Sequence, residues 1–164
     1  MKKLYLFLDI DGVLNDKKYW EKFKKKFPDL KDIRIPLIPF NPKSLRNLKR
    51  LNDKLKKENI KMEIVLSSSW RKYSENQYIL KAKMIEYGLK IEHLTPIRNN
   101  KTEEIKEWLK ANFNPQKYII IDDSNFLNFE DKHFVKTDMN SGFTNKKMRE
   151  TLKKVRKLYG KKTI

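Results

Sequence analysis

The sequence predicts an α/β fold in which a mostly parallel sheet is covered by helices on both faces. Two observations and one rule of sheet topology lead to this prediction. Short apolar runs typical of buried strands alternate along the chain with longer segments of helical periodicity. Strands that are separated by helices pair in parallel in such folds. Acidic residues or serines directly follow three of the apolar runs, at the strand ends where open parallel sheets bind ligands.

The N-terminal half begins with a buried strand at residues 3–9. Residues 61–70 predict a second strand that runs into polar residues, and residues 75–87 predict a helix that stops at Gly88. Between the two strands, residues 43–58 predict a helix with lysines on its outer face. Asn41 and Pro42 suit the start of this helix, and its apolar stripe consists of Leu45, Leu48, Leu51 and Leu55.

The C-terminal half continues the alternation. Residues 105–113 predict a helix that ends before Pro115, and residues 117–123 predict a third buried strand. A short fourth strand is expected at 133–138. Thr144 is placed to cap a last helix at 145–158.

Residues 13–42 fit this pattern least. Residues 17–27 place Trp20, Phe23 and Phe27 on one helical face among lysines, and 33–42 is too rich in proline for a central strand. We therefore expect one domain, residues 1–164, with a small excursion at about 13–42 that forms a flap or minimal cap. The aromatic face is expected to pack on the domain, and a substrate lid is the alternative.

Composition narrows the class of protein. With 164 residues, 38% of them hydrophobic, the chain is long enough to bury a real core. It contains no cysteine, which excludes disulfides and zinc–thiolate sites. Its first apolar run is too short for a signal peptide and no segment approaches a membrane span, so a soluble cytoplasmic protein without a membrane partner is expected.

The net charge of +18 is the strongest compositional signal. A field of that sign attracts phosphates, nucleic acids or anionic membranes. Lysine supplies 32 of the 39 basic residues, and asparagine and isoleucine are also abundant. An AT-rich coding bias is therefore an alternative explanation for the charge.

The acidic strand ends suggest phosphoryl-transfer chemistry. Asp9 and Asp11 follow the first strand, and Asp122 and Asp123 follow a later one. Four neighbouring carboxylates repel one another, and Mg²⁺, which prefers oxygen ligands, removes the conflict. A carboxylate can also attack phosphorus, and a second one two residues on can exchange a proton with the leaving oxygen. Ser67 and a lysine could hold the nonbridging oxygens.

Four stretches of the chain resemble the motifs of the haloacid-dehalogenase (HAD) superfamily. "LDIDGVLN" is similar to the first motif, "IVLSSSWR" to the second and "IIIDD" to the fourth, while Lys101 in "KTEEIKEWL" suits the basic third motif. The combination looks most like the small HAD domains of RNA-repair proteins. This resemblance implies a HAD-like Rossmannoid three-layer α/β/α sandwich without a large cap domain.

The resemblance also implies roles for individual residues. Asp9 would be the nucleophile and a metal ligand, and Asp11 the general acid and base, with its backbone carbonyl on the metal. Ser67 would hold a phosphoryl oxygen, and Lys101 would neutralise charge, with Arg98 as its competitor. The metal site would be completed by Asp122 and Asp123, of which the family's alternative Gly-Asp ending favours Asp123 as the direct ligand.

Several residues nearby have more than one interpretation. Ser68 and Ser69 compete with Ser67, and one of them is expected to cap the following helix. Arg71 makes either a phosphate contact or a salt bridge, and it joins Ser67, Ser68 and Lys101 in the predicted substrate-binding set. Trp70 and Trp108 are expected in the core, and His93 and His133 are expected to be structural residues at strand edges. Gly142 is expected in a turn and Asp138 at the edge of the site.

The sequence thus predicts a Mg²⁺-dependent phosphohydrolase that acts through an aspartyl phosphate. With no large cap, the site should admit a large substrate, and the charge favours phosphorylated RNA or DNA ends. The lysine-rich residues 17–26 are expected to hold backbone phosphates. The alternatives are a phosphatase for nucleotides or sugar phosphates, and a basic nucleic-acid-binding module without turnover.

Overall fold

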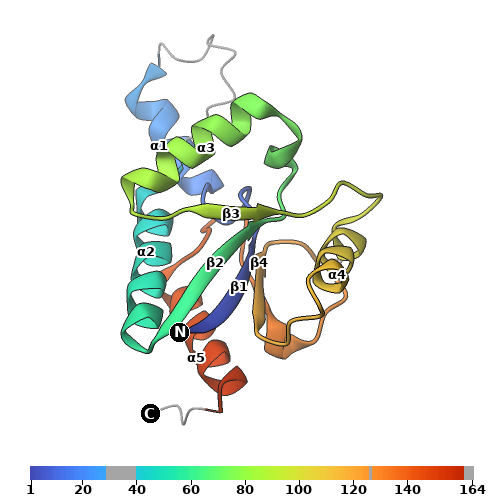
Figure 1. Ribbon diagram of the computed structural model, residues 1–164. Coiled ribbons are helices and arrows are strands. Elements are labelled where there is room, and N and C mark those ends of the chain that lie inside the picture. The colour runs from blue at the N-terminus through green and yellow to red at the C-terminus, as the bar shows by residue number, and fades with distance from the viewer. Residues whose placement is uncertain (29–39, 126, 161–164) are drawn as a thin grey trace.

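A five-stranded parallel sheet forms the centre of the protein (Figure 1). The computed structural model describes residues 1–28, 40–125 and 127–160. The strand order is β3-β2-β1-β4-β5, so the first strand lies in the middle of the sheet. The strands are β1 (Lys2–Leu8), β2 (Ile60–Leu66), β3 (Ile91–Leu94), β4 (Tyr118–Asp122) and β5 (Phe134–Lys136).

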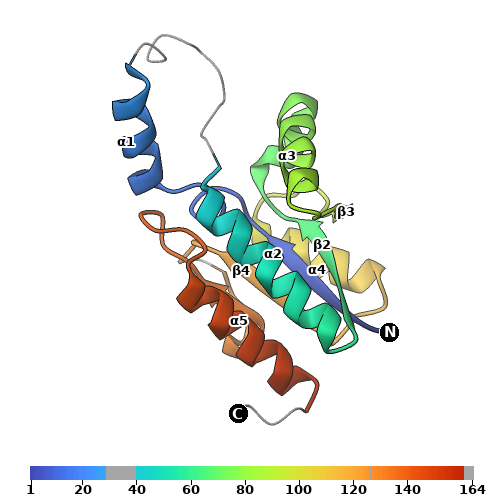
Figure 2. The ribbon, with the colours of Figure 1, turned by 90° about the vertical axis from the view of Figure 1, so that its left-hand side faces the viewer.

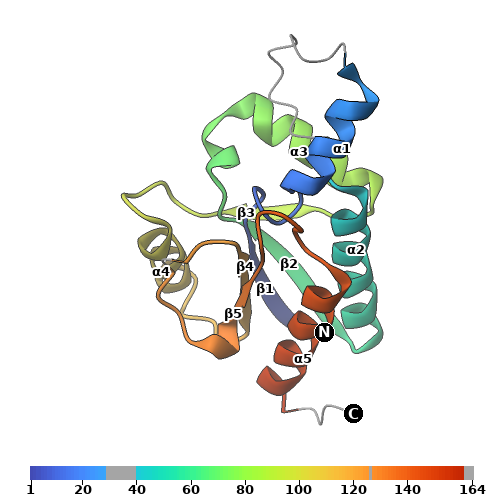
Figure 3. The ribbon, with the colours of Figure 1, turned by 180° about the vertical axis from the view of Figure 1, so that it is seen from behind.

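Helices cover both faces of this sheet. In Figure 2, α2 and α5 lie side by side in front of the strands, while α4 lies behind them. The view from behind shows the same three layers, with α3 and α1 above the sheet (Figure 3). The helices are α1 (Lys17–Lys26), α2 (Pro42–Lys57), α3 (Ser74–Glu86), α4 (Lys101–Ala111) and α5 (Asn145–Leu158), with 3₁₀ turns η2 (Ser69–Lys72) and η3 (Asp131–His133).

The apolar residues of β1 explain why both faces are covered. Successive strand residues point to opposite faces, so Leu6 and Leu8 join the larger core cluster, which also contains the buried leucines of α2. Phe7 joins a second cluster with Trp108 of α4, whose ring lies 5.2 Å from that of Phe7. A strand that is apolar on both faces belongs in the centre of such a sandwich. The predicted three-layer α/β/α fold is confirmed.

The predicted helices match the structure closely, and one strand was missed. Thr144 caps α5 as predicted, and Asn100 caps α4, which begins at Lys101, four residues earlier than expected. Residues 91–94 form the edge strand β3, which the sequence analysis did not predict as a strand. Its residues are mostly half-buried or exposed, so the apolar signal of a buried strand is absent. His93 lies on this strand, 3.1 Å from Glu63.

The aromatic face of α1 is only partly buried, since Trp20 and Phe23 are half-buried. No residue of α1 is buried, and Phe27 is 41% exposed, so the described residues do not confirm that this aromatic face packs on the domain. Trp20, Phe23 and Phe27 instead contact one another along their own helix, because residues three and four apart share a face. Most of the proline-rich stretch 33–42 lies outside the described residues.

The strand order places a site between β1 and β4. The chain leaves β1 for β2 on one side of the sheet and later returns to β4 on the other, which makes this a topological switch point. In open α/β sheets, ligands bind at such a point, beyond the carboxyl ends of the strands. The backbone N–H of Asp9 donates to Ile121 O at 3.1 Å, and that of Ser67 donates to Leu8 O at 3.0 Å. The polar strand ends are therefore held side by side.

Candidate active site

Three carboxylates meet at the ends of β1 and β4. Asp9, Asp122 and Asp123 each offer an oxygen, and these oxygens all lie within 4.8 Å of one another. Asp9 and Asp122 are buried, whereas Asp123 is half-buried. The predicted convergence of these residues is present in the fold.

Lys101 lies against this cluster from the first turn of α4. Its Nζ is 3.1 Å from Asp9 Oδ2 and 2.6 Å from Asp122 Oδ2. The competing residue, Arg98, pairs instead with Glu107, with Nη2 2.5 Å from Oε1, and half of its side chain is exposed. The structure therefore places Lys101, and not Arg98, at the carboxylates.

The electrostatics of the cluster favour a cation. Burial and the charge of Asp122 raise the pKa of Asp9 from its ordinary 3.8 to about 6. Burial and the charge of Asp9 likewise raise the pKa of Asp123. Burial lowers the pKa of Lys101, but its two carboxylate partners outweigh that effect and raise it. One lysine thus leaves the carboxylates incompletely neutralised.

The Asp11 side chain lies apart from these three carboxylates. Asn15 Nδ2 donates to Asp11 Oδ1 at 2.8 Å, and the indole Nε1 of Trp70 donates to both oxygens, at 3.3 Å and 3.2 Å. The Asn15 side chain also accepts from Gly12 N–H at 3.1 Å, which closes the turn after β1. Asp11 is therefore fixed by two donors. It is not one of the three clustered carboxylates, but besides burial and Asp9, its charge is near enough to raise the pKa of Asp123.

The contact of Trp70 with Asp11 was not predicted from the sequence. Trp70 is buried in the larger core cluster, as expected, yet its polar edge reaches the turn after β1. The indole N–H is a donor that seeks a partner when the ring is buried. Trp70 directly follows the strand-end serines in "SSSW". This position next to the predicted site is the sequence signal that could have indicated the contact.

The first of the three serines has an unusual environment. Ser67 is fully buried, and among the described residues its Oγ has no hydrogen-bond partner. Thr137 Oγ1 is the other such atom among the described residues. A buried hydroxyl without a protein partner is uncommon, and the one of Ser67 is free to bind a ligand oxygen. The second serine, Ser68, caps η2, since its Oγ accepts from Trp70 N–H at 3.4 Å. Ser69 is exposed.

Arg71 makes the salt bridge that was one of its two predicted roles. Its Nη2 lies 2.6 Å from Glu104 Oε2, and both side chains are buried. Its other donors contact three backbone carbonyl oxygens, those of Thr95, Ser68 and Pro96. The guanidinium group thus links η2 to the segment after β3, and the donors named here are bound to the protein itself.

Gly12 allows the turn after β1 to approach the acidic cluster. Its φ of +71° is in the left-handed region, and a Cβ atom there would lie 2.5 Å from Asp123 Oδ2. Glycine at this position therefore brings the backbone next to the Asp123 carboxylate.

The segment after β5 also contacts the turn after β1. The N–H of Phe143 donates to Val13 O at 2.7 Å, and Gly142 has a φ of +62°, as expected of a turn residue. Asp138 is exposed, and its Oδ1 accepts from Asn140 N–H at 2.7 Å, which orders the same turn.

The site opens into a small depression next to Ser67. A cavity of about 180 Å³ is bordered by Ser67, Lys101 and the residues around Arg98. Its lining residues are polar or charged and come from the end of β2, from η2 and from the segment that leads into α4.

A parallel α/β sandwich with paired aspartates after its central strand is the architecture of the HAD superfamily, which includes phosphatases and other hydrolases. Within it, the family model described as "HAD domain in Swiss Army Knife RNA repair proteins" matches residues 5–148, and the chain therefore belongs to this family. No curated protein and no solved structure matched the chain. Within the described residues, no helix combines the length and apolar character needed to cross a bilayer.

Proposed function

We propose that the protein is a Mg²⁺-dependent phosphohydrolase that forms an aspartyl phosphate on Asp9 and acts on phosphorylated nucleic-acid ends. The observation that carries this proposal is the placement of Lys101 against Asp9 and Asp122, beside the unpartnered hydroxyl of Ser67. These groups are a nucleophile, a fixed positive charge and a free donor around one point. That is the set of groups that phosphoryl transfer requires.

In the first half-reaction, an oxygen of Asp9 attacks phosphorus and forms an acyl phosphate. The bond from phosphorus to the leaving oxygen breaks, and Asp11 gives that oxygen its proton. Lys101 and the Ser67 hydroxyl hold the nonbridging oxygens. Asn15 and Trp70 keep the Asp11 carboxyl group in place through their two hydrogen bonds.

In the second half-reaction, Asp11 acts in the reverse direction. Its carboxylate takes a proton from water, and the water oxygen bonds to phosphorus. The acyl phosphate bond then breaks, which releases inorganic phosphate and restores Asp9. Asp11 ends the cycle protonated, as it began.

The donor chemistry of the acidic cluster fits Mg²⁺. The ion would be held by carboxylate oxygens of Asp9 and Asp123 and by the backbone carbonyl of Asp11. Both carboxylate oxygens of Asp122 already accept hydrogen bonds, from Lys101 and from Ser124 N–H, which supports Asp123 as the direct ligand and Asp122 as its support. When bound, Mg²⁺ would neutralise the carboxylates and the phosphoryl oxygens.

The nucleic-acid end is favoured as substrate by the family and by the charge. The matching family comprises HAD domains of RNA-repair proteins, and the net charge of +18 attracts a polyanion. Between β1 and α2, the described residues form one short helix, α1, and no large cap that would enclose a small substrate.

A phosphate-release panel with and without Mg²⁺ tests this function. It compares 3′- and 5′-phosphorylated oligonucleotides, mononucleotides, sugar phosphates and phosphopeptides, with Asp9→Asn as the inactive control. We expect the oligonucleotides to be the better substrates at low salt and their advantage to shrink as salt rises, by about 0.7 in log–log slope per phosphate contact. Equal turnover of oligonucleotides and mononucleotides would support a metabolic phosphatase. Binding without turnover would support a nucleic-acid-binding module.

A further inference from the structure

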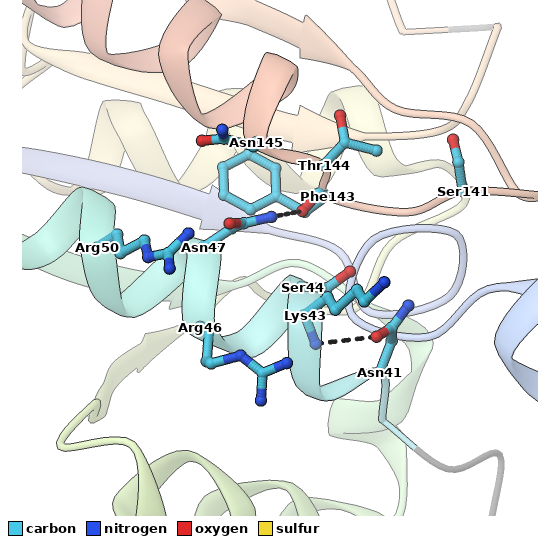
Figure 4. Close-up of a pocket in the computed structure, with 10 residues that line it drawn as sticks. All are labelled: Asn41, Lys43, Ser44, Arg46, Asn47, Arg50, Ser141, Phe143, Thr144 and Asn145. Atoms are coloured by element: carbon cyan, nitrogen blue, oxygen red, sulfur yellow. Dashed lines mark hydrogen bonds between the residues drawn. The ribbon is translucent and has the colours of Figure 1, made fainter.

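A second polar cavity lies on the α2 and α5 side of the strand ends. Two adjoining cavities, each of about 370 Å³, share Asn41, Lys43, Arg46 and Ser141, so they form one groove. Residues between Asn41 and Arg50, the start of α5 and the loop between β5 and α5 line the first of these cavities (Figure 4). Asn47 of α2 donates to Phe143 O at 2.9 Å and fixes its floor. We call this feature the basic groove.

Five cations border the basic groove. Lys43, Arg46 and Arg50 occupy one stripe of α2, three and four residues apart, and Lys18 and Lys22 line the α1 side. All five are exposed, and none has a salt bridge or side-chain hydrogen bond within the part of the chain that the structure describes. Their charge is therefore available to a ligand.

The acidic residue in the groove wall does not neutralise these cations. Asp16 is buried, and its oxygens accept from Tyr19 N–H at 2.9 Å and from Asn41 Nδ2 at 2.5 Å. Another lysine-rich cavity of the protein is different, since there Lys154 pairs with Asp131 at 2.9 Å. Among the described residues that line the basic groove, Asp16 is one negative charge against five positive ones, so the groove keeps a net positive charge.

The other groove residues suit a nucleic-acid backbone. Amide and hydroxyl side chains, here Asn41, Ser141 and Asn145, commonly contact phosphate and sugar oxygens. Tyr19 adds an aromatic ring on which a base can stack. Cations, neutral donors and an aromatic ring are the combination found in single-strand binding grooves.

The loop after β1 connects the basic groove to the acidic cluster. Asp16 lines the groove, and Asp11 lies five residues earlier in the same loop, at most about 18 Å away along an extended chain. Asp9 is buried, so a flexible strand end can reach it more readily than a rigid duplex. A strand held in the groove can therefore extend its terminus to the site within a few nucleotides.

We propose that the basic groove binds the phosphodiester backbone of a single-stranded nucleic acid, a few nucleotides from the terminal phosphate that is hydrolysed. The position of that terminus rests on the proposed function, but backbone binding in the groove does not. Of the lysines on α1, the groove uses Lys18 and Lys22. Lys24 and Lys26 lie over the aromatic rings of Trp20 and Phe27 instead.

The test measures binding without catalysis. A fluorescent 12-nucleotide RNA and the matching DNA, neither carrying a terminal phosphate, are titrated in EDTA and followed by anisotropy at several salt concentrations. The groove variant is Lys43→Ala/Arg46→Ala/Arg50→Ala. The matched control, Lys81→Ala/Lys90→Ala/Lys110→Ala, removes the same charge from exposed positions in α3, in the turn after it and in α4.

We expect the groove variant to bind about tenfold more weakly at low salt and to lose about two units of the log–log salt slope, for three contacts at about 0.7 each. The control should bind within twofold of the parent, and both variants should melt at the parent's temperature. Comparison of the RNA with the DNA shows which strand the groove prefers. Weaker binding of either strand to the groove variant, but not to the control variant, supports the proposal. Equal weakening in both variants, or equal displacement by an acidic peptide of matched charge, would overturn it.

The binding titration and the phosphate-release panel can fail independently of each other. Groove-dependent binding by a protein that releases no phosphate would support the groove and reject the phosphatase. Phosphate release from oligonucleotides with no effect of the groove variant on binding would do the reverse.

Discussion

The indole Nε1 of Trp70 donates a hydrogen bond to the carboxylate of Asp11 at 3.2 Å, although the two residues are 59 positions apart in the chain. Trp70 also packs on Phe40, with ring centroids 5.3 Å apart, so the indole cannot turn away without disturbing the core. The proposed general acid is thereby held from the core side. We therefore expect Trp70 to act as a positioning residue for Asp11.

Trp70→Phe should retain most of the packing but lose the donor. Hydrogen bonds to charged groups contribute about 1.5–3 kcal/mol, so kcat should fall about 10- to 100-fold while KM changes little. The loss should be smaller for p-nitrophenyl phosphate, because its leaving group needs less protonation. Steady-state kinetics on both substrates measure this. Trp108→Phe is the control for aromatic packing, and an equal loss there would contradict the role of Trp70.

Asp9→Asn should abolish turnover without unfolding the protein. The substitution removes the nucleophile and also one of two buried carboxylates that repel each other. Phosphate release and circular dichroism measure the two effects. Activity above a small fraction of the parent's would exclude Asp9 as the nucleophile.

The stability change in Asp9→Asn should depend on pH. Burial and the charge of Asp122 raise the pKa of Asp9 to about 6, so its protonated form stabilises the fold below about pH 4 and this contribution is lost as pH rises through 6. Without metal, the variant should therefore gain on the order of 2–3 kcal/mol over the parent between pH 4 and pH 7. Urea unfolding in EDTA at several pH values measures this, and a gain independent of pH would contradict it.

Asp11→Asn should lose most activity for a different reason. The leaving oxygen is no longer protonated and water is no longer activated, and such assistance is worth about 10²–10⁴ in rate. A chromogenic ester with an activated leaving group should lose less than an alkyl phosphate. Equal losses on the two esters would argue against general acid catalysis by Asp11.

Lys101→Met should reduce both activity and stability. The change leaves Asp9 and Asp122 without their shared cation, and breaking a buried ion pair typically costs about 3–5 kcal/mol. Added Mg²⁺ should restore part of the melting temperature, because it supplies positive charge to the same carboxylates. Arg98→Met is the matched control and should do little, since its ion pair with Glu107 is exposed. Similar effects of the two variants would exclude the special position of Lys101.

Gly12→Ala should weaken metal binding. The new Cβ would lie 2.5 Å from Asp123 Oδ2 and would displace that carboxylate. Calorimetric titration with Mg²⁺ should show a loss of about 10- to 100-fold, as for other changes that misplace a ligand. Gly88→Ala is the control, because Gly88 has a similar φ of +66° with no atom near the added Cβ. Equal Mg²⁺ affinity in both variants would contradict the steric argument.

The central strands and the acidic cluster could be predicted from the sequence for one physical reason. The buried strands β1, β2 and β4 each finish in a run of buried apolar residues, so their ends are sharply marked by Asp9, Ser67 and Asp122. Parallel pairing then brings these ends to one edge of the sheet. Lys101 was assigned only through the resemblance to the basic third motif, because the helix was expected to begin at residue 105 and β3 was not predicted.

Other parts of the site could not be predicted in this way. The contact of Trp70 with Asp11 depends on how a core ring is oriented, and apolar periodicity carries no information on that. Arg71 forms a salt bridge because Glu104 is buried beside it. Glu104 lies 33 residues away in the chain, so the sequence could not decide between a salt bridge and a phosphate contact. The edge strand β3 has too few buried residues to produce a strand signal.

The hydrogen-bond ladder of the sheet continues into the site, through Asp9 N–H to Ile121 O and Ser67 N–H to Leu8 O. Backbone amides in such a ladder exchange with solvent only when a large part of the structure opens, whereas a helix without buried residues, such as α1, can open at low cost. We therefore expect Asp9 and Ser67 to share the free energy of opening of the central strands. On the proposed function, α1 could then move to admit or release a long substrate while Asp9 and Ser67 keep their positions.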